Sequence, residues 1–415
     1  MVCIKAFKAV RPSEEFPDKV AALPYDVMSS EEARIMVENN PYSFLHIDKA
    51  EIDLGQDTNP YDKIVYEKAK ENLNDFIDKG IFVKENKECL YVYRLIMQGR
   101  VQTGIVFCAS VDDYINNKIK KHEHTREEKE IDRINHVDYC NANTGPIFLT
   151  YKNSEEINLI VEQWINSNET LYNFKSEDEI THIVWRIENE EVVNKLIKLY
   201  ENIPEVYIAD GHHRCASAAK VATIRRNNKV NFKGHEEFNY FLSVAFPHKD
   251  LYIMDYNRIV EDLNGLSVKQ FLKKIEEKFS INIYQGTGPI ALIKRGTFGM
   301  YLEQQWYELK IKEDLINKND LVKSLDVSIL QDYLLKPILG IQDPRKDKRI
   351  DFVGGIRGLK ELEKRVDEGM KVAFLMYPTS IEDLMSIADI DEVMPPKSTW
   401  FEPKLRSGLF IHELE

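Results

Sequence analysis

The chain has 415 residues, 43% of them hydrophobic and 30% charged, so it is long enough for a large core and for more than one domain. Its net charge of −13 argues against an extended nucleic-acid-binding surface, although a local basic pocket is compatible with it. The cysteines are dispersed, the first residues lack the apolar region of a signal peptide, and no apolar run approaches the roughly 20 residues of a membrane span. We therefore expect a cytoplasmic protein that binds neither nucleic acid nor membrane.

The first part of the chain, residues 1–110, is expected to be an α/β segment. Residues 29–32 have the Ser-Ser-Glu-Glu pattern of a capped helix start, and residues 61–79 have the periodicity of a helix. Between them, the apolar and aromatic residues of 42–47 predict a strand.

A β-hairpin is expected at the end of this segment. Residues 89–97 and 101–111 are rich in β-branched and aromatic side chains, which favour strands. Gln98, Gly99 and Arg100 lie between the two runs and supply the turn. The two strands should therefore pair directly.

Strands and helices alternate from residue 111 to about residue 260. The pattern predicts a strand at 147–151, a helix at 157–167, and a strand and a helix within 180–200. Two further runs, 238–246 and 251–258, are strongly β-forming and are separated by a short polar segment, so we expect them to pair.

The last part of the chain, residues 261–415, alternates helices with short strands. Helices are expected at 361–368 and 381–389, with a buried strand at 372–377 between them. Intermixed strands, helices and hairpins favour an α+β (mixed α/β) fold over a doubly wound parallel sheet. Neither GxGxxG nor GxxxxGK[ST] occurs, so Rossmann and P-loop chemistry have no support in the sequence.

The segment Asp210-Gly211-His212-His213-Arg214 is the strongest functional candidate. It follows an apolar run at 206–209 and precedes an alanine-rich helical run, so it predicts a strand that turns at a glycine into a helix. The N–H groups and the dipole of a helix N-terminus attract anions, and an arginine adds a fork that suits phosphate. The alternative is a tight turn in which Asp210 only caps the helix.

A second candidate is the segment His122-Glu123-His124-Thr125. Its carboxylate could act as a general base for a hydroxyl group. The two histidines also have a metal-ligand spacing, for which His136, Asp210, His212 and His213 would be further ligands. The alternative is a solvated charged loop, since lysines and glutamates surround the segment.

A third candidate is the proline-rich segment 395–408. It holds Lys397 and Lys404 together with Trp400 and Phe401, so it could close over a nucleotide, with its aromatic rings on the base and its cations on the phosphates. The alternative is a C-terminal segment whose aromatic side chains only anchor it to the core.

Taken as an ordered set, these motifs resemble one bacterial and archaeal family of unknown function. The set comprises Pro24-Tyr25-Asp26-Val27, Lys121 to Thr125, Asp132-Arg133, Ala209 to Arg214 and Lys397 to Gly408. The central part of that family is similar to the ParB/sulfiredoxin-like superfamily, whose functional relatives include the free L-serine kinases. The resemblance implies a ParB/sulfiredoxin-like catalytic core with a large insertion at 111–260, between an N-terminal segment at 1–110 and a C-terminal segment at 261–415 that closes the site.

The resemblance also implies roles for individual residues. The turn from Asp210 to Arg214 matches the phosphate-binding motif of the kinases, and Glu123 matches their upstream catalytic glutamate. These two positions are 87 residues apart, wider than in the small kinases, and an insertion would explain the gap.

The expected activity is phosphoryl transfer from ATP or ADP to the hydroxyl of L-serine, giving O-phosphoserine. Such reactions depend mainly on positioning and charge neutralisation. The expected catalytic residues are Glu123, Asp210 and His212, and Asp210 would hold Mg²⁺. The expected nucleotide-binding residues are Gly211, His212, His213, Arg214, Lys397 and Lys404. The alternatives are a ParB-like nucleotide-binding NTPase or switch and a metal-dependent hydrolase that uses the histidines and Asp210. The choice between ATP and ADP, the acceptor and the oligomeric state stay open.

Overall fold

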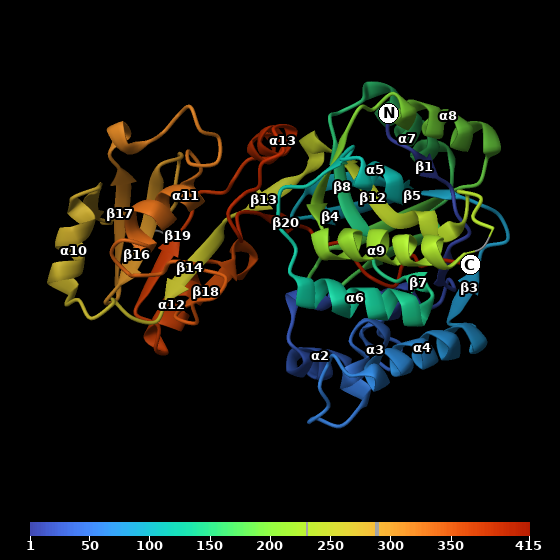
Figure 1. Cartoon of the computed structure of the whole chain (residues 1–415), viewed down its shortest axis with the longest axis horizontal. Helices are drawn as coiled ribbons and strands as arrows, with labels where there is room; N and C mark the ends of the chain where they lie inside the picture. The colour runs from blue at the N-terminus through green and yellow to red at the C-terminus, as the bar shows by residue number, and fades with distance from the viewer. Residues whose placement is uncertain (230, 287–289) are drawn as a thin grey trace. The chain divides into compact units, whose positions relative to one another are not determined.

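The computed structural model describes residues 1–229, 231–286 and 290–415, and these form two compact units (Figure 1). Unit 1 comprises Met1–Leu251 and Pro403–Glu415, and unit 2 comprises Tyr252–Glu402. Both units combine sheets with helices, which confirms the α+β class expected from the sequence. The expected domain limits at 110 and 260, and the ParB/sulfiredoxin-like core, stay predictions.

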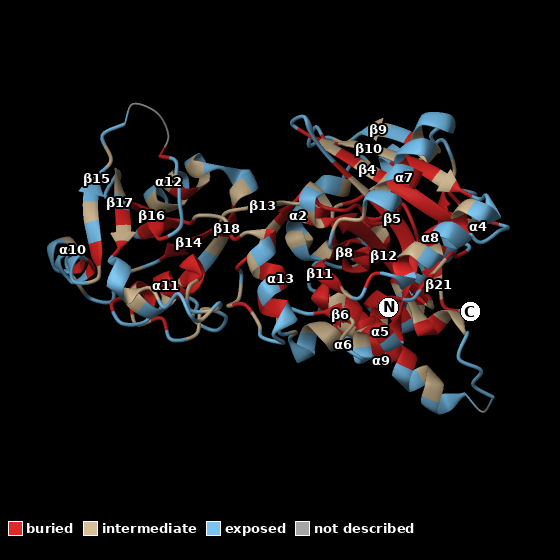
Figure 2. Cartoon of the chain, turned by 90° about the horizontal axis from the view of Figure 1, so that it is seen from above, coloured by how far each residue is buried: buried red, intermediate tan, exposed pale blue. Residues whose placement is uncertain are grey.

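The main sheet of unit 1 has the strand order β6-β11-β8-β12-β5-β4-β10-β9, with β1 paired to β5. Its strands are β1 (Ile4–Lys5), β4 (Leu90–Met97), β5 (Arg100–Ser110), β6 (Ile119–Lys120), β8 (Ile147–Tyr151), β9 (Tyr172–Lys175), β10 (Thr181–Ile187), β11 (Val206–Asp210) and β12 (Tyr240–Pro247). Strand β11 runs parallel to β6 and antiparallel to β8. The sheet therefore draws on the chain from its start to residue 247, and Figure 2 shows many of its strand residues buried.

The expected hairpin is confirmed by β4 and β5, which pair from Tyr91↔Val106 to Met97↔Arg100. The two turn residues, Gln98 and Gly99, have φ angles of +52° and +81°. Positive φ at both central positions is the mark of a type I′ turn, whose twist matches that of the strands. The turn geometry and the alternation of side chains along the two strands thus specify the same pairing register of β4 with β5.

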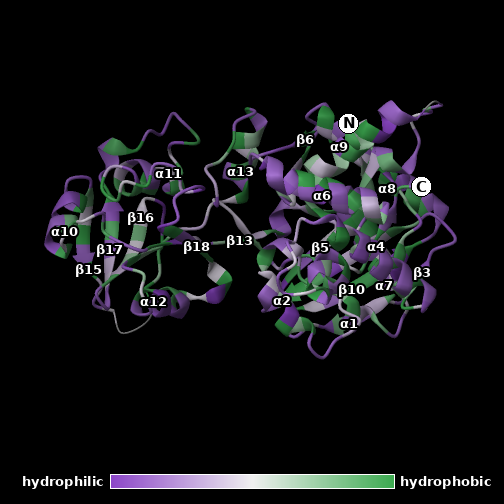
Figure 3. Ribbon diagram, turned by 60° about the horizontal axis from the view of Figure 1, so that its bottom comes forward, coloured by the Kyte–Doolittle hydropathy of each residue, from purple (hydrophilic) through white to green (hydrophobic). Residues whose placement is uncertain are grey.

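Helices cover the sheet of unit 1 and form a layer of their own. They are α1 (Pro17–Val20), α2 (Ser30–Val37), α3 (Leu45–Asp48), α4 (Lys63–Asp78), α5 (Val111–Ile115), α6 (Glu127–Cys140), α7 (Glu155–Ser167), α8 (Glu190–Glu201) and α9 (His212–Asn228). Helix α6 packs against both α9 and α4. In Figure 1, α9 and α6 lie in front of the sheet, with α2, α3 and α4 below them. Helices α7 and α8 carry both hydrophobic and hydrophilic residues, as expected of helices that lie on a core (Figure 3).

The helix start expected at 29–32 is confirmed, and the strand expected at 42–47 is wrong. Ser29 caps α2 in a capping box with Glu32. Residues Leu45–Asp48 form helix α3 instead of a strand, with Phe44 and Ile47 buried in the cluster that α2, α3 and α4 share. Their spacing of three is helical, and periodicity alone cannot separate so short an apolar run from a strand.

Unit 2 is built on a sheet of order β15-β17-β16-β19-β14-β18. Its strands are β14 (Tyr256–Val260), β15 (Phe279–Ile283), β16 (Thr297–Leu302), β17 (Gln305–Ile311), β18 (Ile350–Gly354) and β19 (Val372–Leu375); β13 (Tyr252–Met254) pairs separately with β20 (Trp400–Glu402). Its helices are α10 (Val268–Glu276), α11 (Asp326–Leu330), α12 (Leu359–Asp367) and α13 (Ile381–Asp389). The elements expected at 361–368, 372–377 and 381–389 are thereby confirmed.

The pairing expected between 238–246 and 251–258 is wrong. Strand β12 belongs to unit 1, where it pairs with β5 and β8. Strands β13 and β14 belong to unit 2, where they pair with β20 and with β18 and β19. The chain passes from one unit to the other after a short 3₁₀ turn at His248–Asp250, so two β-forming neighbours in sequence join different sheets.

The C-terminal residues 403–415 return to unit 1. Ser407 bridges to Ala22, Ile411 bridges to Val10, and β21 (His412–Glu413) pairs with β7 (Ala142–Asn143). Leu409, Phe410 and Ile411 are fully buried. The end of the chain is therefore part of the core of unit 1. A remaining short pair in unit 1 joins β2 (Val10–Pro12) to β3 (Phe82–Lys84).

Candidate active site at the start of helix α9

The turn between β11 and α9 is shaped by Gly211. Its φ of +94° lies in the left-handed region, where a side chain is strained. A Cβ at this position would also lie 3.0–3.1 Å from the guanidinium of Arg214, which folds back over the turn. The helix begins at His212, so the N–H groups of its first turn have no acceptor within the helix. The strand, turn and helix expected from the sequence are thus present, and the turn offers open donors to an anion.

Asp210 ends β11 with its carboxylate held by several donors. The N–H of Gly211 donates to Oδ1 at 2.9 Å, and Nζ of Lys404 lies 3.1 Å from Oδ2. The guanidinium of Arg214 lies 4.0 Å from the same Oδ2. Burial opposes ionisation, but Lys404 and Arg214 outweigh it and hold the pKa of Asp210 well below its usual range. Asp210 is therefore ionised and neutralises part of the positive charge around the turn.

His212 packs against His122 from the second candidate segment. The two rings are perpendicular, with centroids 4.4 Å apart, and the backbone N–H of His122 donates to Nε2 of His212 at 3.5 Å. Burial lowers the pKa of His122 to about 4 and that of His212 well below its usual value, so both imidazoles are neutral near pH 7. Within the part of the chain that the structure describes, Nδ1 of His122 is buried without a hydrogen-bond partner.

His213 contacts the loop directly after the second candidate segment, at Arg126. Its Nε2 accepts a hydrogen bond from the backbone N–H of Arg126 at 3.1 Å, across 87 positions of sequence. The loop from residue 122 to residue 126 is thus attached at both ends to the two histidines of the turn. Glu123, half-buried, and His124, exposed, lie between these attachments. The structure brings the first and second candidate segments together.

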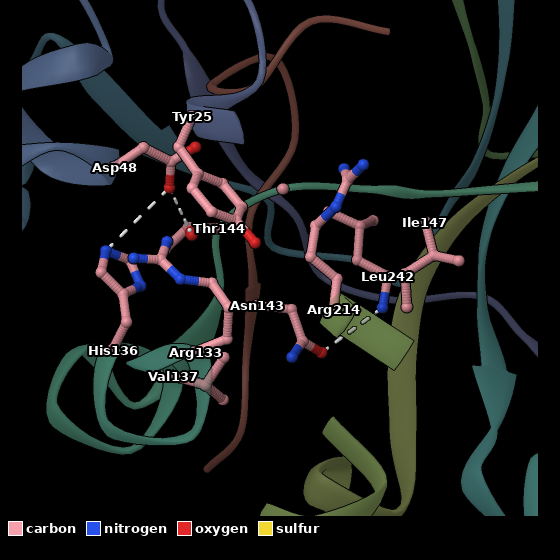
Figure 4. Close-up of a pocket in the computed structure, with 11 residues that line it drawn as sticks. Tyr25, Asp48, Arg133, His136, Val137, Asn143, Thr144, Ile147, Arg214 and Leu242 are labelled. Carbon is pink, nitrogen blue, oxygen red and sulfur yellow. Dashed lines mark hydrogen bonds and ion pairs between the residues drawn. The ribbon is translucent and has the colours of Figure 1, made fainter. Parts of the chain in front are cut away.

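A pocket lies beside Arg214 (Figure 4). Its lining residues are Tyr25, Asp48, Arg133, His136, Val137, Asn143, Thr144, Gly145, Ile147, Arg214 and Leu242. The guanidinium of Arg133 stacks on the ring of Tyr25, 3.9 Å from its centroid. Tyr25 and Arg133 belong to the motif set that carried the family resemblance, which was the available signal for them. Asp48 and Thr144 come from segments to which the sequence alone assigned no chemistry.

The third candidate segment is divided between the two units. Lys404 belongs to unit 1 and contacts Asp210 as described above. Lys397 belongs to unit 2, where its Nζ lies 5.4 Å from the centroid of Tyr256 and its carbonyl accepts from Arg258. Residues 395–408 therefore do not form one continuous segment within a single unit, as closure over a nucleotide at the turn would need. A nucleotide-binding role for Lys397 stays a prediction.

The fit of the site to a metal ion depends on Asp210. Among the residues described, no three His, Cys, Asp or Glu side chains are arranged to hold a metal ion. The histidines 122, 124, 136, 212 and 213 thus do not form, with Asp210, the ligand set that a metal-dependent hydrolase would need. Mg²⁺ requires only one or two carboxylates when phosphates complete its shell. Because Lys404 already contacts Oδ2, Asp210 fits a nucleotide-bound Mg²⁺ reached through water better than a bare ion.

Comparison with models of known protein families identifies the family of this chain. The model of a family described as "Protein of unknown function (DUF1015)" matches residues 4–328. The chain belongs to this family. No curated protein matches it. Over the described ranges, none of the helices has the length and apolar character that crossing a membrane requires.

Solved structures similar to this DUF1015 member share little sequence with it. A conserved hypothetical protein from Pyrococcus furiosus is 15% identical with a TM-score of 0.34, and the match covers 76% of this chain and 96% of the other. A free serine kinase in complex with AMP is 14% identical with a TM-score of 0.34, over 74% and 92%. SbnI with a C-terminal truncation, from Staphylococcus aureus, is 10% identical with a TM-score of 0.38, over 73% and 85%.

Proposed function

We propose that the protein is a small-molecule kinase that transfers a phosphoryl group from ATP or ADP to the hydroxyl of free L-serine, giving O-phosphoserine. The observation that carries the proposal is the attachment of the 122–126 loop to both histidines of the turn. It brings a loop with a carboxylate, suited to hydroxyl activation, to a helix N-terminus with open donors and nearby cations. Phosphoryl transfer needs these two parts side by side. The free cysteines agree with a cytoplasmic protein.

The turn is the part that would hold the donor. The first N–H groups of α9 and the guanidinium of Arg214 would bind phosphate oxygens, because a helix N-terminus and an arginine both favour anions. Lys404 would add a second cation, and a phosphate could compete with Asp210 for it. A nucleotide-bound Mg²⁺ would supply neutralisation of the phosphate charge. Asp210 would contact its water shell.

The loop is the part that would act on the acceptor. Glu123 would orient the serine hydroxyl and accept its proton as the oxygen attacks the terminal phosphorus, while the phosphoanhydride bond breaks and ADP (from ATP) or AMP (from ADP) leaves. His212 is buried and neutral, so its imidazole would donate a hydrogen bond to the transferring group without bringing a full positive charge. His213 would hold the loop in place through Arg126. The protein would thus act by positioning and by neutralising charge.

Product formation tests the proposal directly. Purified protein would be incubated with L-serine, Mg²⁺ and either ATP or ADP, and O-phosphoserine would be measured by phosphorus NMR and mass spectrometry. Phosphoserine with one of the two donors is expected. If neither donor gives phosphoserine, the proposal fails. Nucleotide hydrolysis that L-serine leaves unchanged would instead indicate the NTPase or switch.

Two variants separate the roles of the loop and the turn. Glu123→Gln is expected to lower turnover by about 100-fold or more with little change in nucleotide affinity, since general-base groups contribute on this scale. Arg214→Ala is expected to weaken nucleotide binding itself. The matched control is Glu128→Gln, an exposed residue in the first turn of α6, which should leave both quantities unchanged. Equal activity of Glu123→Gln and wild type would remove Glu123 from the mechanism.

A further inference from the structure

The imidazole of His122 lies against both sides of the bend between β11 and α9. The carbonyl of Ile208, before the turn, accepts a hydrogen bond from the ring, and the ring is perpendicular to that of His212, after the turn. Among the described residues, Nδ1 of His122 has no hydrogen-bond partner, although the residue is only 2% exposed. A neutral imidazole has one N–H and one bare nitrogen. Because the N–H is used by Ile208, Nε2 carries the proton and Nδ1 is a bare acceptor.

The other side-chain acceptors of the turn already have donors. Both oxygens of Asp210 are met, as described above. Backbone N–H groups of the 122–126 loop donate to Nε2 of His212 and to Nε2 of His213. Of these side chains, His122 is therefore the one that keeps an acceptor for a ligand. A buried acceptor without a donor is costly unless a ligand meets it.

Hydrogen-bond donors surround the same turn. Helix α9 begins without a side-chain cap, so the N–H groups of its first turn are open. Nε of Arg214 is buried and has no hydrogen-bond partner in the part of the chain that is described. An anion would accept from both, because a helix N-terminus and an arginine both attract anions.

The charge around Arg214 favours an anion of low charge. Three carboxylates act electrostatically on its guanidinium, those of Asp26, Asp210 and Asp48. They would repel a fully ionised phosphate. A phosphate that keeps a proton carries one negative charge less, and its O–H group is a hydrogen-bond donor.

We infer that the start of α9 binds a phosphate group that keeps a proton: the open N–H groups and Arg214 would hold its bare oxygens, and Nδ1 of His122 would accept a hydrogen bond from its P–O–H group. The bare nitrogen and the open donors then all have partners. The inference rests on the proposed function in assigning a phosphoryl group to this turn, and it adds His122 as a contact of that group. It also predicts selection against sulfate, which has the same tetrahedral shape but no proton near neutral pH.

Two tetrahedral anions test the inference without catalysis. Isothermal titration of the whole chain at pH 7, without Mg²⁺, would compare inorganic phosphate, which carries an O–H group at this pH, with sulfate. Phosphate is expected to bind about 10-fold or more tightly than sulfate, the scale set by a buried acceptor left without a donor. Equal affinities would overturn the inference, and so would the absence of phosphate binding.

His122→Phe removes the bare nitrogen but keeps a planar ring, so it gives a readout that a merely structural role would not give. Phosphate binding is expected to weaken by about 10-fold while sulfate binding stays unchanged, so the preference is lost. His122→Asn keeps an acceptor near the position of Nδ1 and should keep the preference. Equal losses for both anions in His122→Phe would overturn the role of His122. The matched control is His235→Phe, at an exposed histidine of unit 1, which should affect neither anion.

The alcohol of the acceptor substrate is another source of an O–H group. Titration with L-serine and with L-alanine, which lacks the hydroxyl, distinguishes it from the phosphate. If His122→Phe removes a preference for L-serine over L-alanine and leaves phosphate binding unchanged, Nδ1 accepts from the alcohol and the phosphate assignment is wrong.

The inference and the proposed activity can fail separately. Formation of phosphoserine by a protein that binds phosphate and sulfate equally refutes the inference and supports the kinase. A phosphate preference that depends on His122, without formation of phosphoserine, supports the inference and refutes the kinase.

Discussion

The ammonium of Lys404 lies 3.1 Å from the carboxylate of Asp210, although 194 positions separate the two residues. Asp210 ends strand β11, and Lys404 belongs to the C-terminal segment that returns to unit 1. This ion pair sets the charge at the start of α9, with Arg214 as the second cation near the same carboxylate. The end of the chain therefore contributes to the candidate site as well as to the core.

Replacing Lys404 with methionine should weaken both the fold and the site. The two side chains are 10% and 28% exposed, so the carboxylate would lose a partner in a poorly solvated position. We expect the free energy of unfolding to fall by about 1–3 kcal/mol and nucleotide affinity to fall about 10-fold or more. Urea unfolding and nucleotide titration measure the two. Lys63→Met, which removes a 72% exposed lysine, is the control and should change neither quantity appreciably.

Gly211→Ala should show that the turn requires glycine for two separate reasons. One is the positive φ, and the other is the contact of a Cβ with Arg214. Gly234 has a similar φ of +90° but open space around it, so Gly234→Ala isolates the first cost. We expect a loss of about 1 kcal/mol for Gly234→Ala and about 2–4 kcal/mol for Gly211→Ala. Equal losses in thermal unfolding would mean that the contact with Arg214 is unimportant.

Phe410→Ala should show that the C-terminal segment is part of the core of unit 1. Phe410 is fully buried and packs against Tyr91 and Tyr93 of strand β4. Removing a buried phenyl ring costs about 3–5 kcal/mol. The control, Leu159→Ala, removes a 60% exposed side chain from α7 and should stay within about 0.5 kcal/mol of wild type. A Phe410→Ala protein as stable as the control would contradict the packing.

The stability of unit 1 should depend on pH through His182. Burial, assisted by the Arg406 guanidinium, lowers the pKa of His182 to about 3, whereas an unfolded histidine titrates near 6.5. The unfolded chain therefore takes up the proton first as the pH falls. The contribution to stability is full above about pH 6.5 and declines below it, by about 3 kcal/mol at pH 4.

His182→Asn removes this titration and keeps a polar group near the hydroxyl of Tyr93, which lies 2.8 Å from Nδ1. The free energy of unfolding, measured by urea at pH 7, 5.5 and 4, should fall more steeply for wild type than for the variant. Parallel curves would show that His182 is not held neutral.

Elements whose signals are local could be predicted from the sequence. The cap of α2, the hairpin that turns at Gln98 and Gly99 and the glycine turn before α9 depend on hydrogen bonds and φ angles within a few residues, and these predictions were confirmed. The strand expected at 42–47 failed because so short a run, with only four apolar or aromatic residues, fits a helix as well as a strand. The β runs on either side of residues 248–250 were recognised as strands, but each found its partners elsewhere.

The sequence by itself determined the turn from Asp210 to Arg214 and the residue types around it, because a strand, a glycine and a helix start are set by neighbours along the chain. Only the tertiary structure decided what meets that turn. The loop of Glu123 reaches it across about 90 positions, and Lys404 reaches it from the C-terminal segment. Asp48 and Arg133 line the pocket beside Arg214. These contacts depend on which apolar faces pack together across the whole chain, and no local pattern encodes that choice.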